Sequence, residues 1–208
     1  MFKQQPNLVF WIDVSGMPFE TTYVGLIVST PPKISKAVKE LNKSCPRLFS
    51  KKSHKIDKEE LFKVLSVLDS CDIMMFTTKF PSWLWEEYKK EFNNKKSFKE
   101  KMLAFIYYKL MVSKQKVFYN FPYQVITCEE SHLDSIHIVH QNCLMLGLSD
   151  KRKFSFSTST GDYNEGIRLA DFVAHSFKSL KIEKLKQLKN WNFIRIERDN
   201  RLFEKLFD

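Results

Sequence analysis

The sequence is poor in glycine and proline and contains no long apolar run. Only 5 Gly and 7 Pro occur among 208 residues, without a repeat or a low-complexity tract, which argues against a disordered or solenoid protein. No stretch reaches the roughly 20 apolar residues that span a membrane, and the first apolar run ends at Asp13, before it resembles a signal peptide. We therefore expect a cytoplasmic protein with no membrane contact.

The sequence also lacks the cysteine spacing of a zinc site. Its four cysteines are far apart and form no Cys-x-x-Cys or Cys/His pattern; they are Cys45, Cys71, Cys128 and Cys143. We expect four reduced thiols, as is typical of a cytosolic protein.

Hydrophobic residues and positive charge are abundant instead. A hydrophobic content of 43% supports a large core, and a net charge of +10 makes a polyanion such as nucleic acid a natural partner. A lysine-rich, soluble surface without such a partner is the alternative. The basic residues form separate clusters that only folding can merge: Lys51-Lys52, Lys89-Lys90, Lys95-Lys96 and Lys151-Arg152-Lys153.

Periodicity predicts alternating strands and helices. The continuous apolar run 8–15 predicts a buried strand, and the β-branched run 22–29 predicts its hairpin partner. We further expect helices over 34–43, from 58 to about 70, over about 81–116, over 133–146 and from about 163, strands over 72–79, 123–128 and 154–159, and a short strand within the basic connection 47–55. This order indicates an α/β protein with a mixed sheet flanked by helices.

The predicted elements divide the chain into one domain and a tail. We expect a domain over 1–180, with a helical insertion around 81–118, and a basic C-terminal extension over 181–208. Within the insertion, 102–112 is apolar nearly all round, which indicates burial on several sides or a subunit contact in a homodimer.

Two capping boxes mark helix starts. Asp57 and Glu60 have the spacing in which the first side chain caps the helix and the second reaches back to it, and Asp162 and Glu165 repeat that spacing. We therefore assign Asp162 to capping.

Two aspartates far apart in the chain are the main candidates for chemistry. Asp13 closes the apolar run 8–12, and Asp171 lies within the late helical segment. Aspartate is rarely buried unless it is paired or binds a metal, so a carboxylate at the tip of a central strand requires a partner.

Two motifs around these aspartates resemble a known family. Phe10 to Gly16 (FWIDVSG) and Glu165 to Ala174 (EGIRLADFVA) resemble the ribonuclease-H-like family filed as domain of unknown function 3800. Its members typically open with a strand ending in Asp-Glu-Ser-Gly and close with a helix carrying Gly-Leu-Gln-Leu-Ala-Asp. The two motifs bracket residues 8–179, and the middle is similar only in its pattern of elements.

The resemblance implies a ribonuclease-H-like sheet in which Asp13 and Asp171 converge to bind Mg²⁺ or Mn²⁺, which prefer carboxylate oxygen. Such ions, about 4 Å apart in a two-metal site, generate hydroxide and stabilise the leaving oxygen. The third carboxylate would come from the strand 123–128, where Glu129 or Glu130 follows. We favour Glu129; a solvated acidic loop is the alternative.

Helical spacing supplies neighbours for Asp171. Asn164, Arg168, Asp171 and His175 share one helix face. Arg168 would hold a phosphate oxygen, and His175 would assist proton transfer. The alternatives are that Asp171 only pairs with Arg168 on a solvated surface, and that His175 is an ordinary helix residue.

The sequence also departs from the family pattern. Val14 stands where a Glu usually follows the first Asp, Arg168 replaces the usual Gln, and 49–55, where many members place an acidic residue on the third strand, contains no carboxylate. Fewer oxygen ligands weaken divalent-metal affinity.

Two functions follow from these features. The first is a metal-dependent nuclease with Asp13, Asp171, Glu129 and His175 at its centre. The second is a catalytically impaired relative that binds nucleic acid or a protein partner. In both, the residues expected to contact nucleic acid are Arg168, Lys51, Lys52, Lys151 and Arg152.

Overall fold

The computed structural model describes residues 8–15, 21–80, 100–101, 104–105, 108–109, 123–129, 141–143, 153–159 and 164–195. The strands are β1 (Leu8–Ser15), β2 (Thr22–Ser29), β3 (Met74–Phe80), β4 (Tyr123–Glu129), β5 (Lys153–Ser159) and β6 (Trp191–Phe193). The helices are α1 (Pro31–Ser44), α2 (Lys58–Ser70), α7 (Glu165–Ser179) and α8 (Ile182–Leu185), with 3₁₀ turns η1 (Leu48–Ser50) and η2 (Ser53–Lys55).

The six strands form one mixed sheet in the order β5-β4-β1-β2-β3-β6. Strands β1, β2 and β3 are antiparallel neighbours, as the hairpin prediction requires, whereas β4 runs parallel to β1 and β5 runs parallel to β4. Strand β1 therefore lies in the middle of the sheet, which explains why its sequence is continuously apolar.

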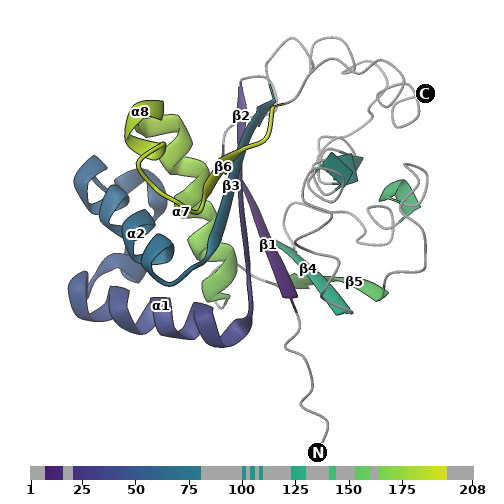
Figure 1. Ribbon diagram of the computed structural model, residues 1–208, viewed down its shortest axis with the longest axis horizontal. Helices are drawn as coiled ribbons and strands as arrows, with labels where there is room; N and C mark the ends of the chain where they lie inside the picture. The colour runs from purple at the N-terminus through teal and green to yellow at the C-terminus, as the bar shows by residue number, and fades with distance from the viewer. Residues whose placement is uncertain are drawn as a thin grey trace, which may run out of the picture.

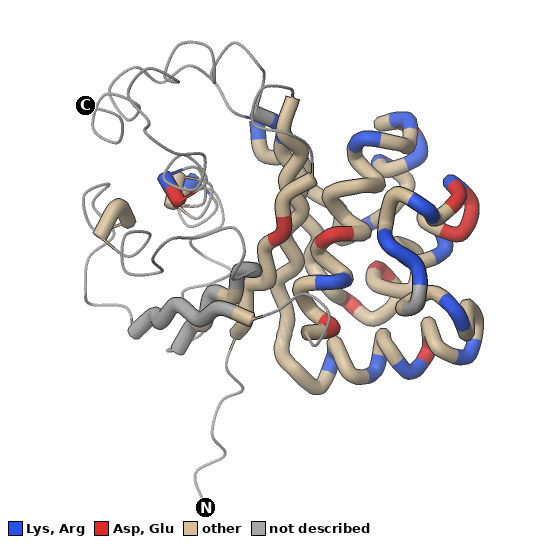
Figure 2. The backbone as a smooth tube through the Cα atoms, turned by 180° about the vertical axis from the view of Figure 1, so that it is seen from behind, with Lys and Arg blue, Asp and Glu red and all other residues tan. Residues whose placement is uncertain are grey.

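Helices α1, α2, α7 and α8 lie on one side of strands β1, β2 and β3 (Figure 1). Helix α7 packs directly on β1 and β2, and α1 and α2 pack against α7. The charged residues lie mostly on the helices, while the described strands carry few (Figure 2). The core consists of the apolar sides of these helices and the sheet face beneath them.

Glycine at position 25 allows α7 to approach the sheet. A Cβ atom built on Gly25 would collide with the backbone oxygen of Ala170 and the backbone nitrogen of Ala174. A larger residue at position 25 would therefore push α7 away from the sheet.

Residues after 180 continue the same core and sheet. Leu185 and Leu188 are buried with the helices, and β6 pairs in parallel with β3 at the sheet edge. The Asp69 carboxylate of α2 accepts hydrogen bonds from the backbone amides of Lys189 (3.2 Å) and Asn190 (2.6 Å). Up to Arg195, the segment predicted as a basic extension is thus bound to the domain.

Most of the predicted elements are confirmed, and two details are wrong. The connection 47–55 forms η1 and η2 rather than a strand. Helix α7 begins at Glu165 with Asn164 as its cap, whose Oδ1 accepts from Gly166 and Ile167, so Asp162 does not cap it. The insertion around 81–118 and the helix 133–146 lie largely outside the described residues, so the homodimer contact through 102–112 stays a prediction.

None of the helices in the described ranges combines the length and apolar character that crossing a bilayer requires.

Candidate functional site

Asp13 is buried in the central strand, on the sheet face that α7 covers. The residue is 6% exposed, and its Oδ1 accepts a hydrogen bond from the Val14 amide at 2.7 Å. Two residues earlier, Trp11 packs against Gly166 of α7. Because strand side chains alternate between faces, Asp13 lies on the same face as Trp11.

The strand register brings Asp13 to the level of Asp171 on α7. Asp13 is paired with Gly25 of β2, and Gly25 is the residue that contacts Ala170 and Ala174. Asp171 follows Ala170 directly and precedes Ala174 by three residues. The segment of α7 that carries Asp171 therefore crosses the sheet beside the residue that pairs with Asp13.

Helix α7 has one polar stripe, formed by Arg168, Asp171, His175 and Ser179. Each of these residues is partly exposed, and most of the rest of the helix is buried. The helix-face prediction is confirmed for Arg168, Asp171 and His175, which share this stripe. The Asn164 side chain is committed to capping, so it does not extend the stripe as predicted.

The turns η1 and η2 pack along this polar stripe. Ser53 of η2 is buried, and its Oγ donates a hydrogen bond to Asp171 Oδ1 at 2.8 Å. Arg168 donates from Nη2 to the backbone oxygen of Lys51 at 2.9 Å, and its guanidinium lies 5.9 Å from the ring centre of Phe49. The alternative in which Asp171 only pairs with Arg168 on a solvated surface is therefore not what the described residues show. Asp171 bonds to Ser53, and Arg168 bonds to the Lys51 carbonyl.

Burial perturbs both titratable groups at the centre of the stripe. Burial raises the pKa of the Asp171 carboxyl above its usual 3.8, while the Ser53 hydrogen bond and the positive charges of His175 and Arg168 oppose that rise. Burial also lowers the pKa of His175 below 6.5, opposed by Asp171 and assisted by Lys178 and His54. The Nε2 atom of His175 lies 3.1 Å from Ser179 Oγ.

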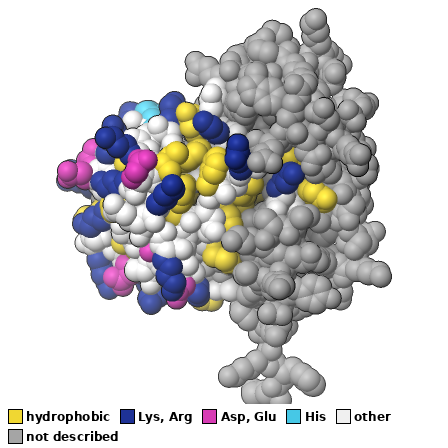
Figure 3. Space-filling view, turned by 45° about the horizontal axis from the view of Figure 1, so that its top comes forward, with side chains coloured by type: hydrophobic (Ala, Val, Ile, Leu, Met, Phe, Trp, Pro, Cys, Tyr) yellow, Lys and Arg dark blue, Asp and Glu magenta, His cyan; other side chains and the backbone are white. Residues whose placement is uncertain are grey.

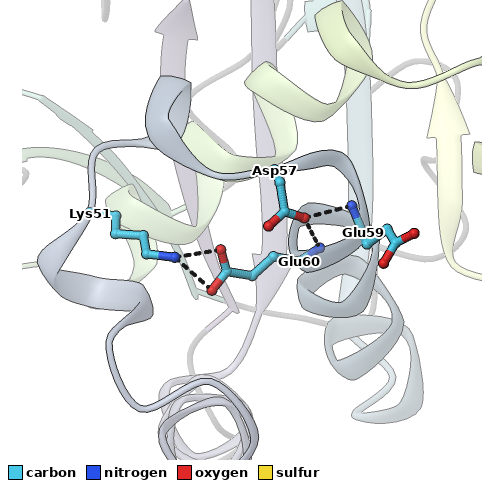
Figure 4. Close-up of polar contacts among 4 residues, drawn as sticks. All are labelled: Lys51, Asp57, Glu59 and Glu60. Atoms are coloured by element: carbon cyan, nitrogen blue, oxygen red, sulfur yellow. Dashed lines mark hydrogen bonds and ion pairs between the residues drawn. The ribbon is translucent and has the colours of Figure 1, made fainter.

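Lys51 binds an acidic neighbour. Its Nζ lies 2.7 and 3.0 Å from the two carboxylate oxygens of Glu60 on α2 (Figure 4). Asp57 caps α2 as predicted, accepting from the amides of Glu59 and Glu60. In a capping box the Glu60 carboxylate would accept from the backbone amide of Asp57. It binds Lys51 instead. Lys51 is thus already paired, while Lys52 is exposed.

For Glu129 the structure describes the backbone only. This residue follows Cys128, the β4 partner of Ile12, just as Asp13 follows Ile12 in β1. The backbone register thus sets position 129 beside Asp13. The side chain of Glu129 and the residues Glu130, Lys151 and Arg152 lie outside what the structure describes, so their roles stay predictions.

Within the described ranges, no group of three or more His, Cys, Asp or Glu side chains is arranged to hold a metal ion. Ser53 is the residue that sequence reasoning missed, because a serine within a lysine-rich stretch gives no signal of a partner 118 residues away.

No protein-family model and no curated protein matches the sequence. Solved structures are similar in shape. A point mutant of Bst-RNase HIII has a TM-score of 0.55 at 13% identity, and Bst-RNase HIII in complex with Mn²⁺ has a TM-score of 0.52 at 15% identity. The chain has a ribonuclease-H-like fold.

The RNase H likeness extends over most of this chain. Alignment with each Bst-RNase HIII structure covers 88% of this chain and 54% of the other, so the chain spans about half the length of that protein. RNase HII from Archaeoglobus fulgidus, solved in complex with PCNA, has a TM-score of 0.50 at 9% identity, covering 95% of this chain and 85% of the other. Identities this low establish the fold and leave the reaction to be argued from the site.

Proposed function

We propose that this chain is a metal-dependent nuclease of the ribonuclease-H-like type, which hydrolyses phosphodiester bonds in nucleic acid. Asp13 and Asp171 are the proposed metal ligands, with Glu129 as the third, and Mg²⁺ or Mn²⁺ is the proposed ion. The resemblance of the two motifs to domain of unknown function 3800 supports the same assignment.

The observation that carries the proposal is the contact of α7 with Gly25. It brings the backbone on both sides of Asp171 against the residue that pairs with Asp13, on the sheet face that Asp13 shares. One oxygen of the Asp13 carboxylate accepts a hydrogen bond from the Val14 amide. We propose that this carboxylate also binds a metal ion together with Asp171.

The donor chemistry of these residues fits a hard cation. Carboxylate oxygens are the ligands that Mg²⁺ and Mn²⁺ prefer, and both aspartates are held on regular elements that limit their movement. When bound, such an ion supplies an activated water and stabilises the leaving oxygen.

Two residues of the polar stripe are proposed to assist the metal ion, one in proton transfer and one in phosphate binding. His175 is the proposed proton-transfer group, because it lies on the same stripe as Asp171 and an imidazole nitrogen can accept or donate a proton. The Arg168 guanidinium has five N–H donors and uses one of them on the Lys51 carbonyl, which leaves others to hold a phosphate oxygen.

A second candidate function is nucleic-acid binding without cleavage. It is favoured by the Ser53 hydrogen bond, because that bond occupies one oxygen of Asp171 with a neutral protein donor. In this alternative, Asp171 serves to anchor η2 on α7.

The test is Mn²⁺ binding, followed by calorimetry, together with a metal-stimulated cleavage assay on single-stranded and double-stranded RNA and DNA. We expect Asp13→Asn and Asp171→Asn to weaken Mn²⁺ binding at least tenfold and to abolish cleavage. The matched control is Asp72→Asn, which changes an exposed carboxylate at a left-handed backbone position (φ 52°) that asparagine adopts readily.

Nucleic-acid binding that persists without any Mn²⁺ binding by the wild-type protein would select the second candidate. If Asp72→Asn reduces cleavage as much as the two site variants do, the assignment of Asp13 and Asp171 is wrong.

A further inference from the structure

The large hydrophobic residues left exposed in the described part of the chain lie close together in sequence. They are Ile182, 46% exposed, and Phe193, 44% exposed. They belong to the segment that runs from the end of α7 through α8 to β6. A single exposed hydrophobic residue is ordinary, so the surroundings of Phe193 decide whether it marks a binding site.

Phe193 is the outermost ring of an aromatic row. Trp191 and Phe193 lie on the same face of β6, and their ring centres lie 6.4 and 5.3 Å from that of Phe177 on α7. Phe177 in turn meets Tyr23 of β2 edge-on at 5.9 Å. Phe177, which Trp191 and Tyr23 contact in turn, therefore packs against Phe193 and leaves part of that ring open to solvent.

The aromatic row starts beside the candidate site. Tyr23 and Gly25 are two residues apart on β2 and pair with Ser15 and Asp13, respectively. Two residues of a strand span about 7 Å. Gly25 also pairs with Thr77 of β3, and Thr77 pairs with Phe193, so Phe193 lies in the same row across the sheet as Asp13. Phe193 is the exposed ring of the aromatic row, because Phe177 is buried in the core.

Lysines are frequent in the segment that joins α7 to β6. Residues 178–189 contain five lysines and one acidic residue, Glu183. Four of the lysines are exposed, namely Lys178, Lys181, Lys186 and Lys189, whereas Lys184 lies over the ring of Phe62 at 4.5 Å. Figure 3 shows Lys and Arg side chains beside hydrophobic ones on the described part of the surface.

An exposed ring among lysines fits one class of ligand better than others. An unpaired base stacks on the ring while its phosphates meet the lysines, whereas a duplex offers phosphates and keeps its base faces covered. Helix α1 provides an internal comparison, because its exposed lysines Lys33, Lys36, Lys39 and Lys43 have no exposed large hydrophobic residue among them.

We propose that the edge formed by Lys178, Lys181, Lys186 and Phe193 binds single-stranded nucleic acid, with a base stacked on Phe193 and phosphates held by the lysines. This inference deepens the proposed function, because it names an unpaired strand as the substrate class of the site beside Asp13.

The experiment measures binding without cleavage. Fluorescence anisotropy in EDTA compares a labelled single strand of about 20 nucleotides with a duplex of the same length, over a series of salt concentrations. We expect Phe193→Ala to weaken single-strand binding about tenfold, since stacking one base contributes on the order of 1–3 kcal/mol. Duplex binding should stay within about twofold, because a duplex keeps its base faces covered, and Phe193→Trp should retain single-strand affinity.

The lysines have a matched control. Lys178→Ala with Lys181→Ala should reduce the slope of log affinity against log salt by about 0.7 per lysine for a single strand. Lys36→Ala with Lys39→Ala removes the same charge from α1 and should leave that slope unchanged. Circular dichroism on every variant identifies loss of folding, and Phe193→Trp tests the stacking role if Phe193→Ala fails to fold.

Three results would overturn the inference: equal single-strand affinity for Phe193→Ala and the wild type, equal loss of slope for the two lysine pairs, or displacement of the single strand by an equal charge concentration of polyglutamate. Because the assay contains EDTA, its outcome is independent of metal-dependent cleavage. A protein that stacks a base but does not cleave would contradict only the proposed function.

Discussion

Helices α1 and α7 belong to the same layer, yet their surroundings differ. Helix α1 buries four of its fourteen residues and presents lysines to solvent, whereas α7 buries nine of its fifteen and packs on the sheet. Polar side chains on α1 are therefore hydrated, while those on α7 meet other protein groups. A polar stripe that persists on an inner helix requires defined partners, and Ser53 and the Lys51 carbonyl provide them.

The largest expected effect comes from the contact that makes α7 the inner helix. Gly25→Ala places a Cβ atom against the backbone of Ala170 and Ala174, and we expect it to lower the free energy of unfolding by about 3 kcal/mol. Chemical denaturation measures this change. Gly166→Ala meets the Trp11 side chain instead, which can shift more easily than backbone, so its cost should be smaller. Equal stability of Gly25→Ala and the wild type would show that α7 does not depend on this approach.

A smaller effect is expected from the bond between η2 and α7. Ser53→Ala removes a hydrogen bond that lowers the pKa of Asp171, so that pKa should rise further and stability should fall by about 1 kcal/mol. Titration of the Asp171 carboxyl by NMR measures the first effect. Ser70→Ala is the control, because Ser70 bonds only to the backbone of its own exposed helix end. If the pKa of Asp171 does not rise, the bond is not formed in solution.

The smallest effect is a change in pH dependence. The lowered pKa of His175 means that, below pH 6.5, the unfolded chain binds more protons than the folded one, so stability falls as pH decreases through this window. His175→Gln should flatten that slope. His54→Gln should flatten it less, because it removes only one of the causes that lower the pKa of His175, while burial, the largest cause, and Lys178 remain. An unchanged slope in His175→Gln, measured by denaturation between about pH 5 and 7, would contradict this assignment.

Local patterns predicted what local physics determines. The continuous apolar run of β1, the period of α2 and the Asp57 cap are each patterns within a short stretch of sequence, and each is confirmed. The cap of α7 was misassigned because Asp162 and Asn164 are both good capping residues at plausible positions. A strand was expected at 47–55, but the sheet order gives it no neighbour, and the chain turns there instead.

Contacts between residues far apart in the chain could not be predicted from sequence patterns. The Ser53–Asp171 bond joins residues 118 apart, and the three-residue strand β6 is stabilised by β3 and by Asp69, over 100 residues earlier. A short strand has little intrinsic preference, so its tertiary partner decides whether it forms. The convergence of Asp13, Asp171 and Glu129 is a question of the same kind, which is why the resemblance supplied that hypothesis and periodicity did not.

The position of α7 in the chain has a consequence for biosynthesis. Strands β1, β2 and β3 are complete at residue 80, but the helix that shields their inner face begins at residue 165. At about 5–20 residues per second, a ribosome leaves that apolar surface without its cover for several seconds or more. We expect nascent chains to need a holding chaperone during this interval, and Gly25→Ala, which delays docking further, to aggregate during expression.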